Sequence, residues 1–132
     1  MGFTYVEITV YNPADLTSWR KIELLVDSGA LFTAIPRGLL EELGLTPVAR
    51  RRLKVFGGGI IERDIGGAVV EHEGKRAVVP IIFGDAEDIP VLGATALESL
   101  GYQLDPVTKE LKPIELLMLM LMLKVKQIID TD

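Results

Sequence analysis

The sequence contains no cysteine and only one histidine, His72. Without cysteine the chain can form neither disulfides nor thiolate metal sites, and an intracellular, cytoplasmic location is favoured. A single histidine excludes metal sites and catalytic arrangements that need two. We expect His72 to be an exposed neighbour of a turn at residues 73–75, not a ligand, and we predict no metal ion or other cofactor.

Basic patches and long apolar runs are also scarce. The formal net charge is −5, and the main basic cluster, residues 50–52 with Lys54, is expected to be a solvated strand start, so nucleic-acid binding is disfavoured.

The segment of residues 3–10 is interrupted by Glu7 and lacks a basic start, which argues against a secretory leader. Val6 does not fit a myristoylation start. The longest apolar run, residues 116–123, is too short to cross a bilayer.

What the sequence does contain is a short apolar run that leads directly into an acid, in residues 24–30 (Leu-Leu-Val-Asp-Ser-Gly-Ala). A run this short favours a buried strand over a helix. A carboxylate at its end is costly to bury unless it is paired, hydrogen-bonded or protonated, and we expect Asp27 to be such a buried acid. Gly29 allows close backbone approach. The competing interpretation is an ordinary Asp-Ser-Gly turn.

Short β-prone segments separated by turn residues predict a mostly β fold. We expect strands at residues 3–11, 18–26, 32–35 and 81–83, and hairpins at 53–65, 68–79 and 104–111. The first hairpin carries Gly57, Gly58 and Gly59 at or beside its tip and should project into solvent. Residues 66–67, both glycine, predict a bend or bulge. Short helices are expected at 37–43 and 95–100. Together these elements predict a small closed or rolled β architecture, of the β-barrel kind, with one or two short helices.

The length of 132 residues fits one domain. We assign residues 1–113 to this domain and residues 114–132 to a C-terminal apolar tail. Leucine and methionine favour a helix, but a strand is not excluded. A segment that is apolar on all sides must be buried on more than one face, so we predict that the tail is a dimer interface. Contact of the tail with a membrane or with another protein is the alternative.

Three motifs, in order, resemble those of the retropepsin-like (retroviral-type) aspartic proteases, especially their cellular single-domain relatives. The motifs are Asp27-Ser28-Gly29-Ala30, Phe56-Gly57-Gly58-Gly59-Ile60 and Val91-Leu92-Gly93. In that family the corresponding segments are the catalytic aspartate turn, a glycine-rich flap, and an apolar-apolar-glycine motif before a short helix. The similarity in order and spacing covers residues 4–113. It implies the closed β-barrel of those enzymes.

The resemblance also implies an activity, the hydrolysis of peptide bonds in extended polypeptides. Aspartic proteases use two carboxylates that share one proton. Because the chain has only one Asp-Thr/Ser-Gly motif, a working site requires a homodimer in which each chain contributes Asp27. By resemblance, Ser28 bonds across the dimer, Gly29 leaves room for substrate, Ala30 packs below, and the flap closes over the peptide.

Two positions depart from the retroviral pattern. Leu31 stands where an acid is usual, and Ala94 where an arginine is usual. Since both partners of that ion pair are absent, the dimer must be held together otherwise, and the tail is a candidate. Two other classes stay open: a non-catalytic dimeric peptide-binding or scaffold module with the same fold, and a β-roll that oligomerises through its tail while Asp27 only caps a turn.

Overall fold

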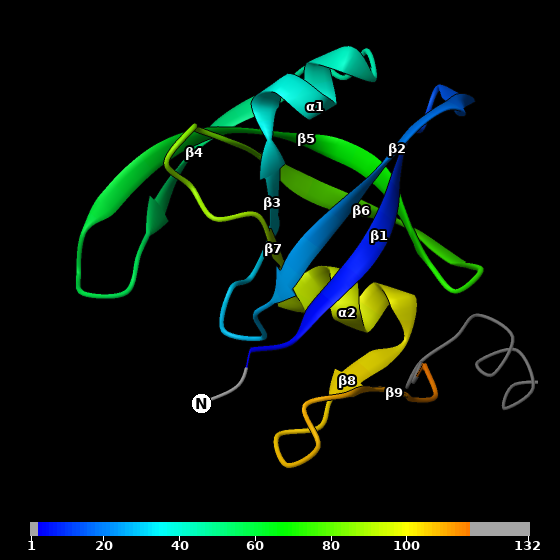
Figure 1. Ribbon diagram of the computed structural model, residues 1–132. Coiled ribbons are helices and arrows are strands. Elements are labelled where there is room, and N and C mark those ends of the chain that lie inside the picture. The colour runs from blue at the N-terminus through cyan, green and yellow to red at the C-terminus, as the bar shows by residue number, and fades with distance from the viewer. Residues whose placement is uncertain (1–2, 117–132) are drawn as a thin grey trace, which may run out of the picture.

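A computed structural model describes residues 3–116, which form a mostly β structure with two short helices (Figure 1). The strands are β1 (Tyr5–Asn12), β2 (Asp15–Val26), β3 (Thr33–Pro36), β4 (Ala49–Lys54), β5 (Ile60–His72), β6 (Lys75–Gly84), β7 (Val91–Leu92), β8 (Tyr102–Leu104) and β9 (Leu111–Pro113). The helices are α1 (Arg37–Glu42) and α2 (Ala94–Leu100). The predicted strands and both predicted helices are confirmed, with ends that differ by a few residues.

Seven strands form one sheet in the order β1-β2-β7-β3-β6-β5-β4, and β8 pairs with β9 separately. β1 also pairs with β5, with Thr9 opposite Glu71, so the strands between β1 and β5 in this order form a closed ring of pairings. Most pairs are antiparallel, but β2 with β7 and β3 with β6 are parallel. The β2–β7 pair places Leu92 beside Val26, the residue directly before Asp27.

The core lies inside this ring of strands. The burial of side chains alternates along the middle of β1, as expected for a half-buried strand. Ile8 and Val10 are fully buried, whereas Glu7, directly before Ile8, is exposed. α1 contributes Leu40 and lies at the top of Figure 1, whereas α2 lies lower in the view, above β8 and β9. α2 buries Leu97 and Leu100 and ends at Gly101, whose φ of 79° is the left-handed conformation typical of a helix end.

The predicted bulge at residues 66–67 is wrong. β5 runs straight through both glycines and keeps one register with β6, with Gly66 opposite Ile81. The physical reason for a glycine at this point is space, since a Cβ on Gly66 would lie 3.1 Å from the Phe83 ring and 3.2 Å from the Thr46 carbonyl oxygen. The residue allows close packing within an unbroken strand.

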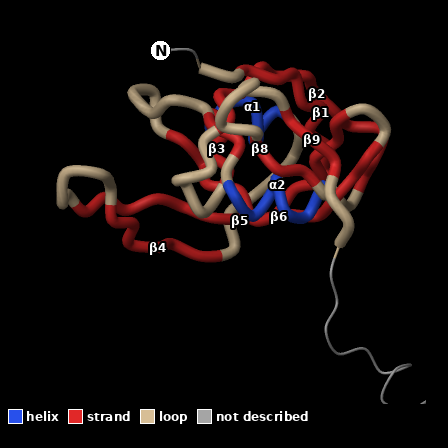
Figure 2. The backbone as a smooth tube through the Cα atoms, turned by 90° about the horizontal axis from the view of Figure 1, so that it is seen from below, coloured by secondary structure: helices blue, strands red, loops and turns tan. Residues whose placement is uncertain are grey.

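The β4–β5 hairpin extends from the body of the molecule, as Figures 1 and 2 both show. The Val55 N–H donates to the Gly59 carbonyl at 2.9 Å and closes its turn. Gly57 and Gly58 have φ values of 96° and 92°, which few other residues adopt. Phe56 at the tip is fully exposed. The prediction of a glycine-tipped hairpin projecting into solvent is confirmed.

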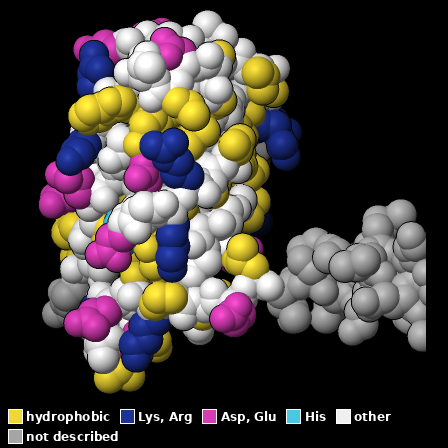
Figure 3. All heavy atoms as spheres, turned by 90° about the vertical axis from the view of Figure 1, so that its right-hand side faces the viewer, with side chains coloured by type: hydrophobic (Ala, Val, Ile, Leu, Met, Phe, Trp, Pro, Cys, Tyr) yellow, Lys and Arg dark blue, Asp and Glu magenta, His cyan; other side chains and the backbone are white. Residues whose placement is uncertain are grey.

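In the described part of the chain, residues 3–116, no helix is both long and apolar enough to cross a membrane. The same residues contain no group of three or more His, Cys, Asp or Glu side chains placed to hold a metal ion. On the face shown in Figure 3, acidic and basic side chains are interspersed. Residues 117–132 of the tail lie outside the described residues, so the predicted tail interface stays a prediction.

Candidate active site

Asp27 lies in a tight turn at the end of β2. The strand ends at the buried Val26, and the Ala30 N–H donates to the Asp27 carbonyl at 3.1 Å to close the turn. The Gly29 N–H donates to Asp27 Oδ1 at 3.0 Å, which orients the carboxylate. Asp27 is nevertheless exposed. The expectation of a buried acid is therefore wrong for residues 3–116 of a single chain, because no helix or strand in this range covers the turn.

The segment around β7 lies against this turn and holds it from behind. The Asp27 N–H donates to the Leu92 carbonyl at 3.0 Å, and the Ala94 N–H donates to the Ala30 carbonyl at 2.7 Å. A third bond runs from the Gly93 N–H to Thr33 Oγ1 at 2.9 Å. The structure thus brings together two of the three predicted motifs, the one at 27–30 and the one at 91–93.

Gly93 is the point at which the two motifs come closest. A Cβ on this residue would lie 2.4 Å from the Phe32 carbonyl oxygen and 2.9 Å from the Ala30 carbonyl oxygen, far inside van der Waals contact. Thr33, which sequence reasoning missed, is fully buried and accepts the Gly93 bond. Its signal in the sequence is a single hydroxyl in the otherwise apolar run of residues 31–35, which directly follows the acidic turn of residues 27–30.

A cleft of about 520 Å³ lies between the acidic turn and the β4–β5 hairpin. This volume is within the range of small-ligand sites, about 300–1,000 Å³. Its walls come from the segment after Asp27, from the hairpin, and from the loop before β7. The hairpin contributes Arg51, Arg52, Leu53, Lys54, Val55, Ile61 and Arg63, and the other walls include Gly29, Ala30, Leu31, Asp88 and Val91. The cleft is partly open to solvent.

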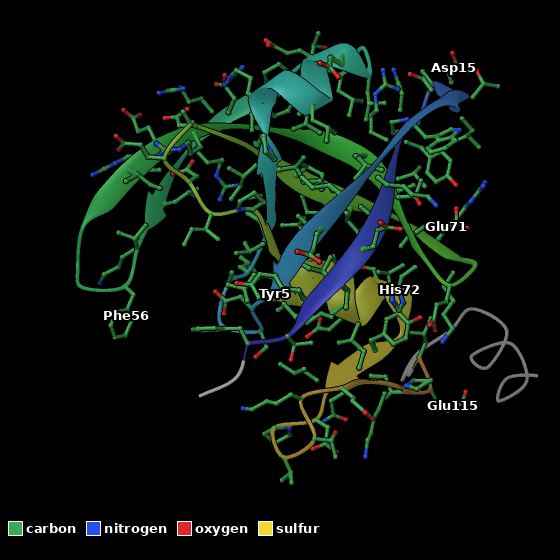
Figure 4. The ribbon with its side chains drawn as sticks, in the orientation of Figure 1. Tyr5, Asp15, Phe56, Glu71, His72 and Glu115 are labelled. Atoms are coloured by element: carbon green, nitrogen blue, oxygen red, sulfur yellow. The ribbon has the colours of Figure 1, made fainter. Side chains whose placement is uncertain are left out.

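The tip of the hairpin stands apart from the acidic turn. Figure 4 shows Phe56 at the outermost point of the hairpin, with its side chain directed away from the strands. Val55 borders the cleft, whereas the motif from Phe56 to Ile60 is exposed. Ser28 is also exposed and lines a different hollow, beside Leu97 and Glu98 of α2. The predicted flap thus stands apart from Asp27 in this chain, and Ser28, the next residue after Asp27, borders a hollow other than the cleft.

One wall of the cleft contains a half-buried ion pair that the sequence did not reveal. Arg63 on β5 donates from Nε and Nη2 to the two carboxylate oxygens of Asp88, at 2.7 and 2.8 Å. The hydrogen bond from Arg63 lowers the pKa of Asp88, and the same bond raises the pKa of Arg63. The pair ties the acidic loop before β7 to β5. Its partners are far apart in sequence, which explains why no local pattern predicts it.

His72 lies outside this cleft and is not an exposed turn residue. Its Nδ1 is 2.9 Å from the Tyr102 hydroxyl, and the two rings meet edge to face. The Lys75 ammonium lies 4.5 Å from the centre of the Tyr102 ring. The side chain is half-buried by these contacts, which join the β5–β6 hairpin to β8. The role of His72 is structural, and the expectation of exposure is wrong.

No family model matches the chain, and no curated protein matches it. The resemblance drawn from the three motifs therefore stays a hypothesis.

Proposed function

We propose that the chain is a homodimeric aspartic endopeptidase of the retropepsin-like type, and that its ring of strands corresponds to the closed β-barrel of that family. One observation carries the proposal. The turn that presents the Asp27 carboxylate is fixed by backbone hydrogen bonds to Leu92 and Ala94, and its residues Gly29 and Ala30 line the cleft. A carboxylate held by rigid backbone next to a substrate-sized groove is the expected arrangement for acid–base catalysis.

The proposed reaction uses the Asp27 carboxyls of both chains and one water molecule. The ionised carboxylate takes a proton from the water as its oxygen attacks the peptide carbonyl carbon. The protonated carboxyl of the other chain gives its proton to the carbonyl oxygen, forming a neutral gem-diol. When the C–N bond breaks, one hydroxyl proton returns to a carboxylate and the other carboxyl protonates the leaving amine. The products are a carboxylic acid and an amine.

Electrostatics explains why the pair would hold a single proton. Two carboxylates about 4 Å apart repel by on the order of 4 kcal/mol at an effective dielectric constant of 20. This repulsion is relieved when the pair holds one proton, which provides one acid and one base for the reaction. The exposure of Asp27 in one chain fits this scheme, because a second chain must reach the carboxylate.

The hairpin and the cleft suit an extended peptide. A bound peptide would lie as an added strand between the segment at 29–31 and β4, with its side chains directed alternately to the two sides. The apolar Leu53, Val55 and Ile61 border the cleft, and they would cover the peptide backbone. The glycine-rich tip next to them would close over the peptide and exclude water.

The test compares cleavage by wild type and by Asp27→Asn on a mixed library of extended peptides, between about pH 3 and 7. We expect wild type to cleave best at mildly acid pH, and Asp27→Asn to cleave at no pH. Asp15→Asn is the matched control, since Asp15 Oδ1 accepts from the Thr17 N–H at the same 3.0 Å as in the Asp27 turn. Asp15 lies at the distant β1–β2 turn (Figure 4). Equal cleavage by Asp27→Asn would overturn the proposal.

A second candidate is the non-catalytic peptide-binding or scaffold module. It is favoured by the exposure of Asp27 and by the Gly29 bond to its carboxylate, since turn capping alone would explain both. A wild type that cleaves nothing across the whole pH range, but binds extended peptides, would establish this function in place of the protease.

A further inference from the structure

The two faces of β4 have different charge environments. β4 pairs with β5 so that Arg51 is opposite Arg63 and Leu53 is opposite Ile61. These four residues all border the cleft. Because side chains alternate along a strand, Arg50 projects from the other face, where it bonds to Asp64 at 3.1 Å. Arg51 therefore lies on the same face of β4 as Leu53, whereas Arg52 and Lys54, which also border the cleft, alternate with these two residues along the strand.

Arg63 and Arg51 form a like-charged pair across the two strands, which is unfavourable unless an anion compensates it. For Arg63 that anion is Asp88, which receives two hydrogen bonds, and Asp85 lies 3.4 Å from Arg63 Nη1. The third nitrogen of Arg63 also donates to the Glu62 carbonyl at 2.8 Å. Each of the three guanidinium nitrogens of Arg63 thus has a partner.

Within the described part of the chain, Arg51 has no such compensation. The ion pairs that the hairpin forms within residues 3–116 involve Arg50, Arg63 and Asp64, and none involves Arg51. Its side chain is exposed at the rim of the cleft, beside a positive neighbour that is already paired. A free guanidinium at such a position matches a carboxylate in both charge and geometry, since its donors can bind two carboxylate oxygens at once.

We propose that Arg51 forms a specificity subsite for an acidic side chain, Glu or Asp, of the peptide that occupies the cleft. The inference rests on the proposed peptide substrate and names its class. The carboxylate would receive hydrogen bonds from Arg51 and would also offset the repulsion between Arg51 and Arg63. The neighbouring Leu53 and Ile61 would contact the stem of the same side chain. The subsite selects peptides with an acidic side chain, although the net charge of the whole chain, −5, has the same sign as that side chain.

The experiment uses pairs of extended peptides that differ only by Glu or Gln at one position, scanned along the peptide at about pH 5.5, where glutamate is ionised. For wild type we expect one position at which Glu raises kcat/KM about fivefold over Gln. This magnitude is what a partly exposed ion pair contributes. Arg51→Gln should abolish this preference, and Arg51→Glu should favour Lys at that position. Arg50→Gln, on the opposite face, should retain it. About 0.5 M salt should weaken it.

The outcomes separate this inference from the proposed function. Cleavage without any Glu-over-Gln preference, or equal loss of preference in Arg50→Gln and Arg51→Gln, would overturn the subsite and leave the protease standing. If wild type cleaves nothing, binding of the same fluorescent peptide pairs is measured by anisotropy. Tighter binding of the Glu peptide to wild type, lost in Arg51→Gln, would support the subsite without the protease. Equal binding of both peptides would overturn the subsite as well.

Discussion

Among the glycines, Gly93 has the least room for a side chain, whereas Gly38 in α1 lies in open space. A Cβ on Gly93 would meet backbone at 2.4 Å, whereas a Cβ on Gly38 would meet nothing within 4 Å. Gly93→Ala should therefore lower the free energy of unfolding by roughly 3 kcal/mol. Gly38→Ala should raise it by about 0.5–1 kcal/mol, because alanine is the better helix residue. Urea denaturation followed by circular dichroism measures both. An unchanged free energy of unfolding in Gly93→Ala would contradict the close contact between the motifs at 27–30 and 91–93.

The pair of Arg63 and Asp88 predicts a specific dependence of stability on pH. Arg63 lowers the folded-state pKa of Asp88 below its unfolded value of about 3.9. The stabilisation is thus fully present above the unfolded pKa and is lost as pH falls through the folded pKa. Asp88→Asn should cost roughly 1–2 kcal/mol near neutral pH. The difference from wild type should shrink below about pH 4. Urea titrations at several pH values measure this, and a difference independent of pH would refute the role of the pair.

The residues of the site were predictable from the sequence to the extent that their pattern is local. Asp27 and Gly93 follow short apolar runs, which placed both at strand ends and, through the resemblance, in one site. Thr33 and Asp88 were not predictable, because their partners Gly93 and Arg63 come from distant parts of the chain. The exposure of Asp27 was also missed, since burial depends on which elements cover a residue and not on the residues that precede it.

Among the elements, the β4–β5 hairpin should be the most mobile part of the site. Its tip has two glycines at positive φ and an exposed Phe56, so few contacts restrain it. Amides of residues 56–59 should exchange with deuterium rapidly and should become protected when a peptide-like inhibitor binds. The β1–β2 turn near Asp15 is the control, and its exchange should not change. Equal protection at the tip with and without inhibitor would exclude a flap role.

Most elements were predictable because their signals are short-range, such as alternation along β1 or glycine after α2. The pairing of the elements was not. β2 lies beside β7, and β3 beside β6, in parallel, with long intervening segments. Periodicity within one segment cannot specify such partners. Residues 66–67 show the same limit, since their glycines mark close packing against Phe83 and not the bulge that their composition suggests.

For the whole molecule, the proposed mechanism requires a second chain. Sedimentation at micromolar concentration should report a dimer, because one chain supplies one Asp27 and leaves it exposed. Ending the chain after Leu116 should weaken the dimer if the tail is an interface, while the described fold stays intact by circular dichroism. A compact monomer at all concentrations would refute the enzyme. An unchanged dimer in the shortened chain would refute only the tail's role.

The hydrogen bond between the Asp27 N–H and the Leu92 carbonyl also has a consequence for the order of events during synthesis. Asp27 is made early, but the strand that holds its turn is made late, and contacts between such distant segments form slowly because a long loop must close first. A nascent chain that has not reached residues 90–94 can present the Asp-Ser-Gly sequence but not the fixed carboxylate. The proposed protease is therefore inactive until nearly all of its domain has been translated.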